Sequence, residues 1–193
     1  MQRICVFCGS RPGIRSDYAI AARALGAALV RAGLTLVYGG GRVGIMGVIA
    51  DEVIARGGEV IGVIPRPLWK REVGHGGVAD LRVVESMHER KALFAELSDG
   101  FVALPGGIGT LEEIFEVWTW SQLGVHSKPV GFLDVGGYYG PLFEFLDQGV
   151  AEGFIDSRTR NTLIVEREPE ALLARFAAYR PPDVRQWIER EET

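Results

Sequence analysis

The sequence predicts a single α/β domain in which a doubly wound, parallel β-sheet carries helices on both faces. Short apolar runs alternate with longer helix-like segments, which is the β-α-β-α pattern of such sheets. The short runs are almost continuously apolar, as expected for strands that are covered on both sides. With 193 residues, 47% of them hydrophobic, the chain is long enough to bury a sizeable core.

Strands are expected where the chain is rich in Val, Ile, Leu and Phe and is interrupted by glycine, proline or charged residues. In chain order they are RICVFC at 3–8, LTLVYG at 34–39, EVIGVIP at 59–65, LRVVE at 81–85, GFVALP at 100–105, PVGFLDV at 129–135 and NTLIVE at 161–166. The last of these is expected at an edge of the sheet.

The longer segments between the strands are expected to form helices. They cover 16–32, 44–56, 87–98, 110–123, 139–152 and, at the end, 168–178. One domain is therefore expected over 1–180, with 181–193 as a peripheral tail.

Composition and charge exclude several classes of protein. The net charge of −4 gives no nucleic-acid footprint, and the basic stretch RPLWKR at 66–71 is interpreted as solvated loop charge. The start, MQRICVFCGS, is too quickly glycine-rich for a signal peptide, and no apolar run reaches the roughly 18 residues of a membrane span. We expect a soluble, cytoplasmic protein with no membrane or nucleic-acid partner.

The two cysteines, Cys5 and Cys8, form a C-x-x-C inside an apolar strand. Redox motifs of this kind normally lie at a helix N-terminus, which lowers the thiol pKa. A structural zinc would need two further ligands, and the sequence has no second cluster. We expect both cysteines to be buried apolar residues, and we expect no metal.

The glycine-rich stretch GGGRVG at 39–44 matches G-x-G-x-x-G, a pattern of dinucleotide sites. It follows the second strand rather than the first, and the next strand ends without the acidic residue that would hold a ribose. No G-x-x-x-x-G-K-[ST] occurs, and no lysine has a context that indicates a pyridoxal phosphate enzyme. We expect no cofactor, although these glycines can still let backbone N–H groups approach an anion.

The stretch PGGIGTLEE at 105–113 has two interpretations. Thr110 and Glu113 fit a T-x-x-E capping box, with Thr110 as the N-cap of the next helix. Alternatively, the free N–H groups of Gly107, Gly109 and Thr110 and the helix dipole form a phosphate site, with Glu113 within one turn of it. A capping box needs neither the proline nor the extra glycines, so the phosphate site explains more of the motif.

The stretch SMHERK at 86–91 has a similar ambiguity. Ser86 and Glu89 fit a capping box, but Arg90 and Lys91 fall early in the helix, where the dipole disfavours cations. Either the two cations are solvent-exposed, or an anionic ligand or a carboxylate lies nearby.

These stretches all follow predicted strands, and ligands of doubly wound sheets bind at the carboxyl ends of the strands. We therefore expect the ends at 8–13, 38–47, 85–91 and 105–113 to converge on one site. Gly9, Ser10, Gly40 and Gly41 are candidates there for contacts with phosphate or ribose.

The combination of motifs closely resembles the LOG family. PGGIGTLEE fits P-G-G-x-G-T-x-x-E in full, and MHERK, VYGGGRVGIMG and CVFCGS precede it in the family's order, over roughly 3–175. Members of the family are cytokinin riboside 5′-monophosphate phosphoribohydrolases, often mislabelled as lysine decarboxylases. The resemblance implies a Rossmann-like homodimer that hydrolyses AMP or N6-substituted AMP to the free base and ribose 5-phosphate.

The resemblance also implies roles for individual residues. Arg90 and Glu113 would be the catalytic pair. The substrate would be bound by Glu72, Lys91, Gly107, Ile108, Gly109, Thr110, Leu111, Glu112 and Thr119. The chemistry fits this independently, because a carboxylate can stabilise an oxocarbenium-like transition state or activate water, and an arginine can orient it.

The resemblance breaks after Glu72. Plant-like members read TGETVGEV where this chain has GHGGVADL at 74–81, so the preferred base is left open. Two rival classes also remain: a nucleotide-like cofactor carrier of the molybdenum cofactor type, and a nicotinamide oxidoreductase. The presence of both Arg90 and Glu113 favours the hydrolase.

Overall fold

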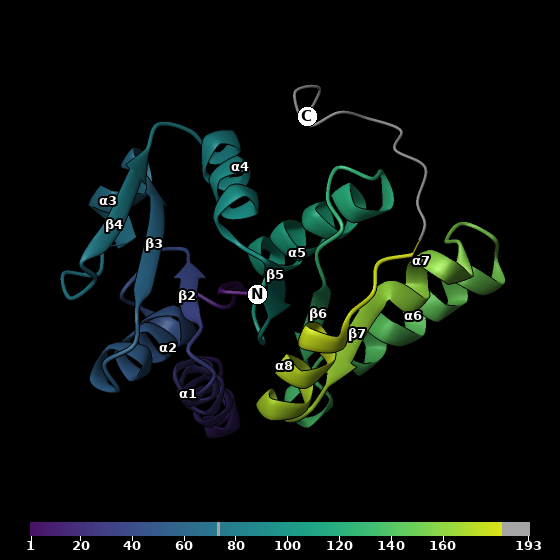
Figure 1. The fold of residues 1–193 in the computed structure, drawn as a ribbon, viewed down its shortest axis with the longest axis horizontal. Coiled ribbons are helices and arrows are strands. Elements are labelled where there is room, and N and C mark those ends of the chain that lie inside the picture. Colours follow the sequence, from purple (N-terminus) through teal and green to yellow (C-terminus); the bar gives the residue numbers. More distant parts are fainter. Residues whose placement is uncertain (73, 183–193) are drawn as a thin grey trace.

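The computed structural model describes residues 1–72 and 74–182, without the side chains of 70–72. Its strands form one parallel, seven-stranded sheet in the order β4-β3-β2-β1-β5-β6-β7 (Figure 1). The strands are β1 (Arg3–Phe7), β2 (Thr35–Tyr38), β3 (Val60–Pro65), β4 (Asp80–Val84), β5 (Gly100–Ala103), β6 (Val130–Leu133) and β7 (Leu163–Glu166). The expected doubly wound α/β fold is confirmed, with the last strand at an edge of the sheet.

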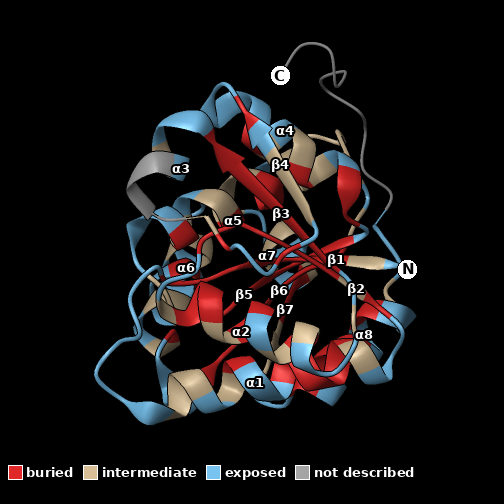
Figure 2. Ribbon diagram, turned by 90° about the vertical axis from the view of Figure 1, so that its left-hand side faces the viewer, coloured by how far each residue is buried: buried red, intermediate tan, exposed pale blue. Residues whose placement is uncertain are grey.

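Helices pack on both faces of this sheet, and the strands lie buried between them (Figure 2). The helices are α1 (Ser16–Arg31), α2 (Gly44–Ala55), α3 (Arg66–Glu72), α4 (Met87–Leu97), α5 (Ile108–Gln122), α6 (Gly140–Ala151), α7 (Ser157–Thr162) and α8 (Pro169–Ala178), with a 3-10 turn, η1 (Val135–Gly137), after β6. One core lies against α1, α2 and α8, and the other against α4, α5 and α6. Within the described ranges, every helix is too short or too polar to cross a bilayer.

Two short helices differ from the expectation. The stretch RPLWKR was expected to be a loop but lies in α3, and α7 precedes the edge strand, which is shorter than predicted. Both helices are short and rich in charged or polar residues, so they lack the apolar period that identifies a longer helix. Asp156 caps α7 by accepting a hydrogen bond from the Arg158 N–H at 2.7 Å. The predicted tail lies, from residue 183 on, outside the described residues.

The two cysteines are buried free thiols, as expected. Cys5 contributes to the core against α4, α5 and α6, and Cys8 contributes to the other core. Burial raises the pKa of both thiols, so neither is a reactive thiolate at neutral pH.

The strand order determines where a ligand can lie. Strand β1 has β2 on one side and β5 on the other, and Phe7 at its end is level with Ala103 of β5. After β1 the chain builds β2, β3 and β4 outward and then returns to β5, so the loops after β1 and β5 diverge from neighbouring strand ends. This is the switch point at which doubly wound sheets bind ligands. The two loops also bond directly, because the Gly9 N–H donates to the Pro105 carbonyl at 3.2 Å.

Candidate active site

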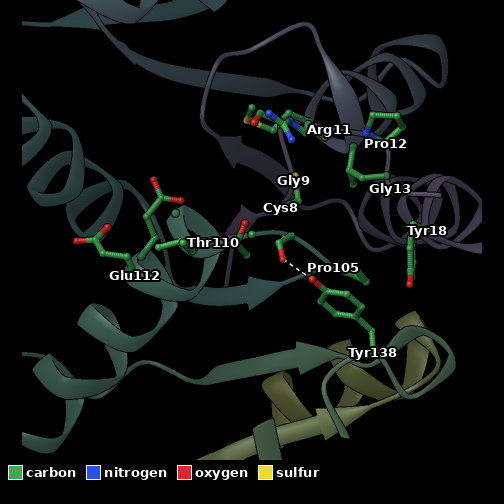
Figure 3. A pocket seen from close by; sticks show the side chains of 18 of the residues that line it. Cys8, Gly9, Arg11, Pro12, Gly13, Tyr18, Pro105, Thr110, Glu112 and Tyr138 are labelled. Carbon is green, nitrogen blue, oxygen red and sulfur yellow. Dashed lines mark hydrogen bonds between the residues drawn. The ribbon is translucent and has the colours of Figure 1, made fainter. Parts of the chain in front are cut away.

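A cavity of about 610 Å³ opens at this switch point (Figure 3). Its walls come from the loop after β1, the turn between β5 and α5, and the first turns of α2 and α4, with Tyr18 and Tyr138 on a further side. The volume falls in the usual range of small-molecule sites, about 300 to 1,000 Å³. The sequence prediction that these loops converge is therefore confirmed, because each of the segments 8–13, 38–47, 85–91 and 105–113 contributes residues to the lining.

The glycine-rich turn forms the start of α5. The N-cap of this helix is Gly107 and its first residue is Ile108, so the predicted capping box with Thr110 as N-cap is wrong. Thr110 is instead a buried residue of the first turn, and a Cβ on Gly106 would lie 2.1 Å from the Thr110 hydroxyl oxygen. Gly106 is thus required by the packing of Thr110.

The other two glycines of the turn are not required by the fold. A Cβ on Gly107 or Gly109 would meet nothing within 4 Å, and neither residue has a positive φ. The first N–H of α5 bonded inside the helix is that of Leu111, which donates to the Gly107 carbonyl at 3.1 Å. The amides before it have no hydrogen-bond partner among the described residues, and the first turn holds no acidic residue. No described group therefore offsets the positive end of the helix dipole, and the helix start can bind an anion.

Two tyrosines that directly follow η1 hold the main chain at and just before this turn. The Tyr138 hydroxyl donates to the Gly106 carbonyl and the Tyr139 hydroxyl to the Leu104 carbonyl, both at 2.7 Å (Figure 3 shows the first bond). Tyr139 is itself held by Asp134, whose carboxylate accepts its N–H at 2.9 Å. The sequence analysis missed Tyr138, for which the available signal was the pair YY that follows two glycines after a predicted strand end.

Arg90 and Glu113 both line the cavity and face each other there. Arg90 Nη2 lies 3.5 Å from Glu113 Oε1, and the two side chains are only 8% and 13% exposed. Burial raises the pKa of Glu113 to about 7, and the neighbouring Arg90 opposes this rise. Glu113 therefore changes its charge near neutral pH, as suits a group that must exchange a proton during catalysis.

The environment of Arg90 leaves part of its guanidinium available. The group lies 5.2 Å from the centre of the Phe94 ring, and a Cβ on Gly39 would come within 2.4 Å of Nη2. Arg90 Nε is buried and has no hydrogen-bond partner among the described residues. A buried donor without a partner is costly, so the fold holds this guanidinium in an environment that is unfavourable for stability.

Helix α4, which carries Arg90, is capped as the sequence predicts. Ser86 is its N-cap, and the Ser86 hydroxyl accepts the Glu89 N–H at 3.1 Å. The Glu89 carboxylate accepts the Glu85 N–H at 2.7 Å, one residue earlier than in an ideal capping box.

Lys91 lies behind the cavity wall. Its ammonium nitrogen lies 2.8 Å from Glu112 Oε1 and 2.9 Å from Glu116 Oε1, and its side chain is mostly buried. Of these residues only Glu112 lines the cavity. The early cations of α4 thus have carboxylate partners from α5, which is one of the two explanations that the sequence left open.

The other residues singled out in the sequence are distributed unevenly. Gly9, Ser10 and Ile108 line the cavity. Leu111 packs against the core, and Thr119, further along α5, donates its hydroxyl to the Phe115 carbonyl at 2.8 Å. The side chain of Glu72 lies outside the described residues.

Gly40 and Gly41 hold the loop that departs from the family pattern. The His75 N–H donates to the Gly40 carbonyl at 3.1 Å, and Gly41 forms a β-bridge with Gly74. His75 is buried, and its Nε2 lies 3.0 Å from the Asp51 carboxylate. These two glycines therefore anchor a loop beside the site rather than line the cavity.

Comparison with known proteins decides the family. A sequence-family profile described as "Possible lysine decarboxylase" matches residues 46–176. A cytokinin riboside 5′-monophosphate phosphoribohydrolase of Arabidopsis thaliana is 50% identical over 93% of this chain and 83% of its own length. The enzyme of the same name from Oryza sativa subsp. japonica, LOG, is 49% identical over 93% of this chain and 74% of its own length.

The chain belongs to the LOG family. The predicted family is therefore confirmed, and the profile's description is the mislabelling noted for LOG proteins. A pyridoxal-dependent decarboxylase needs a Schiff-base lysine, whereas the described lining of the LOG cavity contains none. Among the described residues, no three His, Cys, Asp or Glu side chains come together where they could hold a metal ion.

Solved structures share the fold at much lower identity. A molybdenum cofactor binding protein from Rippkaea orientalis has a TM-score of 0.70 and 21% identity, covering 92% of this LOG chain and 96% of its own. A molybdenum cofactor carrier protein from Chlamydomonas reinhardtii has a TM-score of 0.69 and 23% identity, covering 92% and 99%. At this identity the likeness concerns the fold alone.

The electrostatics of Glu113 predict a pH-dependent cost in stability. The fold favours the protonated acid, so the stability that this preference contributes is present at low pH and is lost as the pH rises from 4.5 to about 7. Glu113→Gln removes the titrating group. The free energy of unfolding of this variant, relative to that of wild type, should therefore rise by about 2 to 3 kcal/mol from pH 5 to pH 8. Urea unfolding at both pH values measures this, and an unchanged difference would show that Glu113 is not destabilised by burial.

Proposed function

We propose that this protein hydrolyses the N-glycosidic bond of adenosine 5′-monophosphates, including AMP and N6-substituted forms such as cytokinin riboside 5′-monophosphates. The products are the free base and ribose 5-phosphate. The observation that carries the proposal is the buried Glu113, held 3.5 Å from Arg90 beside an uncompensated helix start in one cavity. The LOG relatives, half identical to this chain and named for this reaction, support it.

The cavity offers separate places for the two ends of such a substrate. The free amides at the start of α5, with Gly107 and Gly109 open above them, suit a phosphate. Glu113 lies on the second turn of the same helix, so a ribose bound through its phosphate would present C1′ toward the carboxylate. Phosphate binding energy, remote from the reacting bond, would then hold the ribose in the reactive geometry.

The chemistry follows from this placement. As the bond between C1′ and the base nitrogen lengthens, the bonding electrons move to the base and positive charge develops on the ribose ring. The Glu113 carboxylate stabilises that charge and accepts a proton from the attacking water, whose oxygen bonds to C1′. The base leaves after taking up a proton, and one water molecule is consumed.

Arg90 acts on the same carboxylate. Its guanidinium lies too far from Glu113 for a tight hydrogen-bonded pair, and Nε has no partner among the described residues. It can therefore keep Glu113 ionised and still donate to a ribose hydroxyl or to the carboxylate as the substrate arrives.

The alternative is a nucleotide-like cofactor carrier of the same fold. Its support is the likeness in fold to molybdenum cofactor carriers, in which only about a fifth of the aligned residues are identical. A carrier has no use for a buried carboxylate with a pKa near 7 opposite an arginine, so the site geometry favours the hydrolase.

The decisive experiment measures adenine release from AMP. Wild type should release adenine, with a rate that falls as the pH drops below about 7 and Glu113 becomes protonated. Glu113→Gln should reduce turnover by at least about 100-fold while the affinity for AMP stays within about threefold, because the amide keeps the shape but loses the charge. Glu112→Gln, which changes the neighbouring carboxylate, is the matched control and should cost far less. AMP binding without adenine release by wild type would favour the carrier.

The open glycines give a second prediction. Gly109→Ala places a methyl group where the structure has free space, so the fold should keep or slightly gain stability, by up to about 1 kcal/mol. If a phosphate approaches these amides, the same methyl group should lower kcat/KM for AMP by at least about tenfold. Gly140→Ala, at the equally open start of α6 and outside the cavity, is the control and should leave kcat/KM unchanged. Equal activity of both variants would mean that no ligand group lies against Gly109.

We also propose that the protein is a cytoplasmic homodimer. Ile108 at the start of α5 is 87% exposed, while Phe115 and Trp120 on the same helix are only half-buried, so α5 keeps apolar surface that a second copy can cover. Light scattering at micromolar concentration should give twice the mass of the chain, and a monomer would contradict this.

The two free, buried cysteines suit a reducing compartment such as the cytoplasm.

A further inference from the structure

One charge on the cavity wall has no counter-charge among the residues that the structure describes. The charged residues that line the cavity are Arg11, Arg90, Glu112 and Glu113. Arg90 faces Glu113, and Glu112 is paired with Lys91 at 2.8 Å. The exposed guanidinium of Arg11 makes no ion pair, ring contact or hydrogen bond with the described residues. Arg11 is therefore a cation of the site that is available to a ligand.

The backbone holds Arg11 close to the glycine-rich turn. Two residues earlier, Gly9 donates to the Pro105 carbonyl at 3.2 Å and accepts the Ile45 N–H of α2 at 3.0 Å. Gly44, the first residue of α2, has a φ of 65°, and a Cβ there would lie 2.5 Å from Arg11 N. The loop that carries Arg11 is thus fixed between the start of α2 and the turn before α5. Figure 3 shows it across the cavity from Tyr138.

The substrate proposed above has a charge that this site must balance. A phosphate monoester carries between about 1.5 and 2 negative charges at neutral pH, whereas a helix N-terminus supplies about half a positive charge. The charge of Arg90 is offset by the facing carboxylate of Glu113, so Arg90 adds little net positive charge to the site. The planar guanidinium of an arginine matches the oxygens of a phosphate and can donate two hydrogen bonds to them.

We infer that Arg11 binds the 5′-phosphate of the substrate and makes the site selective for phosphorylated over unphosphorylated nucleosides. The inference rests on the proposed function, and it assigns to the loop after β1 a part in substrate selection beside the glycine-rich turn. It concerns binding of the phosphate, not the bond that is cleaved.

Arg11→Met tests this, since methionine keeps part of the side chain and loses the charge. The KM for AMP should rise by about tenfold while kcat stays within about threefold, and the preference for AMP over adenosine in kcat/KM should fall by about tenfold. Inhibition by the product ribose 5-phosphate should weaken by the same factor, while inhibition by adenine should not change. If Arg11→Met weakened inhibition by adenine as much as inhibition by ribose 5-phosphate, the assignment would be overturned, because Arg11 would then act on the whole site.

Two further variants serve as controls. Arg11→Lys keeps the positive charge but loses the planar guanidinium, and it should retain most of the preference of wild type for AMP over adenosine. Arg23→Met removes an arginine from the exposed face of α1, outside the cavity, and should behave as wild type. If Arg11→Met and Arg23→Met gave the same inhibition constant for ribose 5-phosphate, Arg11 would not contact the phosphate.

The inference can fail separately from the proposed function. If wild type released no adenine from any nucleotide, calorimetric titration with ribose 5-phosphate would still measure the phosphate site. Binding by wild type that weakens about tenfold in Arg11→Met would uphold the role of Arg11 even so. Equal binding by the two proteins, or no binding by either, would overturn it. Raising the salt concentration should shrink the difference, because Arg11 is exposed and its attraction is screened.

Discussion

The site depends on the fact that β1 and β5 are neighbours in space but not in sequence. Parallel strands must be joined by crossovers, so the chain lays β2, β3 and β4 on one side of β1 before it returns to place β5 on the other. The loops that leave β1 and β5 then turn toward opposite faces of the sheet, and a cavity opens between them. The bond from Gly9 to Pro105 closes the base of this cavity, and α5, with Glu113, starts directly beyond it.

The second constraint is electrostatic. A carboxylate as buried as Glu113 would by itself prefer to be neutral, and Arg90 is the cation that faces it. The two groups stand slightly too far apart to satisfy each other, and Arg90 Nε has no partner among the described residues. The fold thus tolerates an arrangement that is unfavourable for stability, as is common where groups are held ready for a substrate. The outer pair of Lys91 and Glu112 is, by contrast, in close contact.

Much of the fold could be predicted because its signals are local. The strands are apolar runs, and the long helices fill the segments between them. The short helices α3 and α7 were missed because their charged sequences carry no apolar period. Thr110 fits a capping pattern, yet the helix begins two residues earlier, since the glycine at 107 can take the N-cap conformation with no side-chain hydrogen bond. Arg90 and Glu113 could be named from motifs, whereas the parts played by Arg11 and Tyr138 became clear only from the structure, because their place in the site depends on the order of the strands.

The tyrosine contacts beneath the glycine-rich turn have a consequence for how the turn can evolve. The hydroxyls of Tyr138 and Tyr139 donate hydrogen bonds to the main-chain carbonyls of Gly106 and Leu104, and every amino acid has such a carbonyl. Most of the conformational entropy of a flexible, glycine-rich segment is therefore lost when the chain folds, and little is left to be lost when a ligand arrives. Because the restraint acts on main-chain carbonyls, other side chains that face the ligand can change while the shape of the turn is kept. Recognition of new bases could then arise by substitution around a fixed phosphate-binding frame.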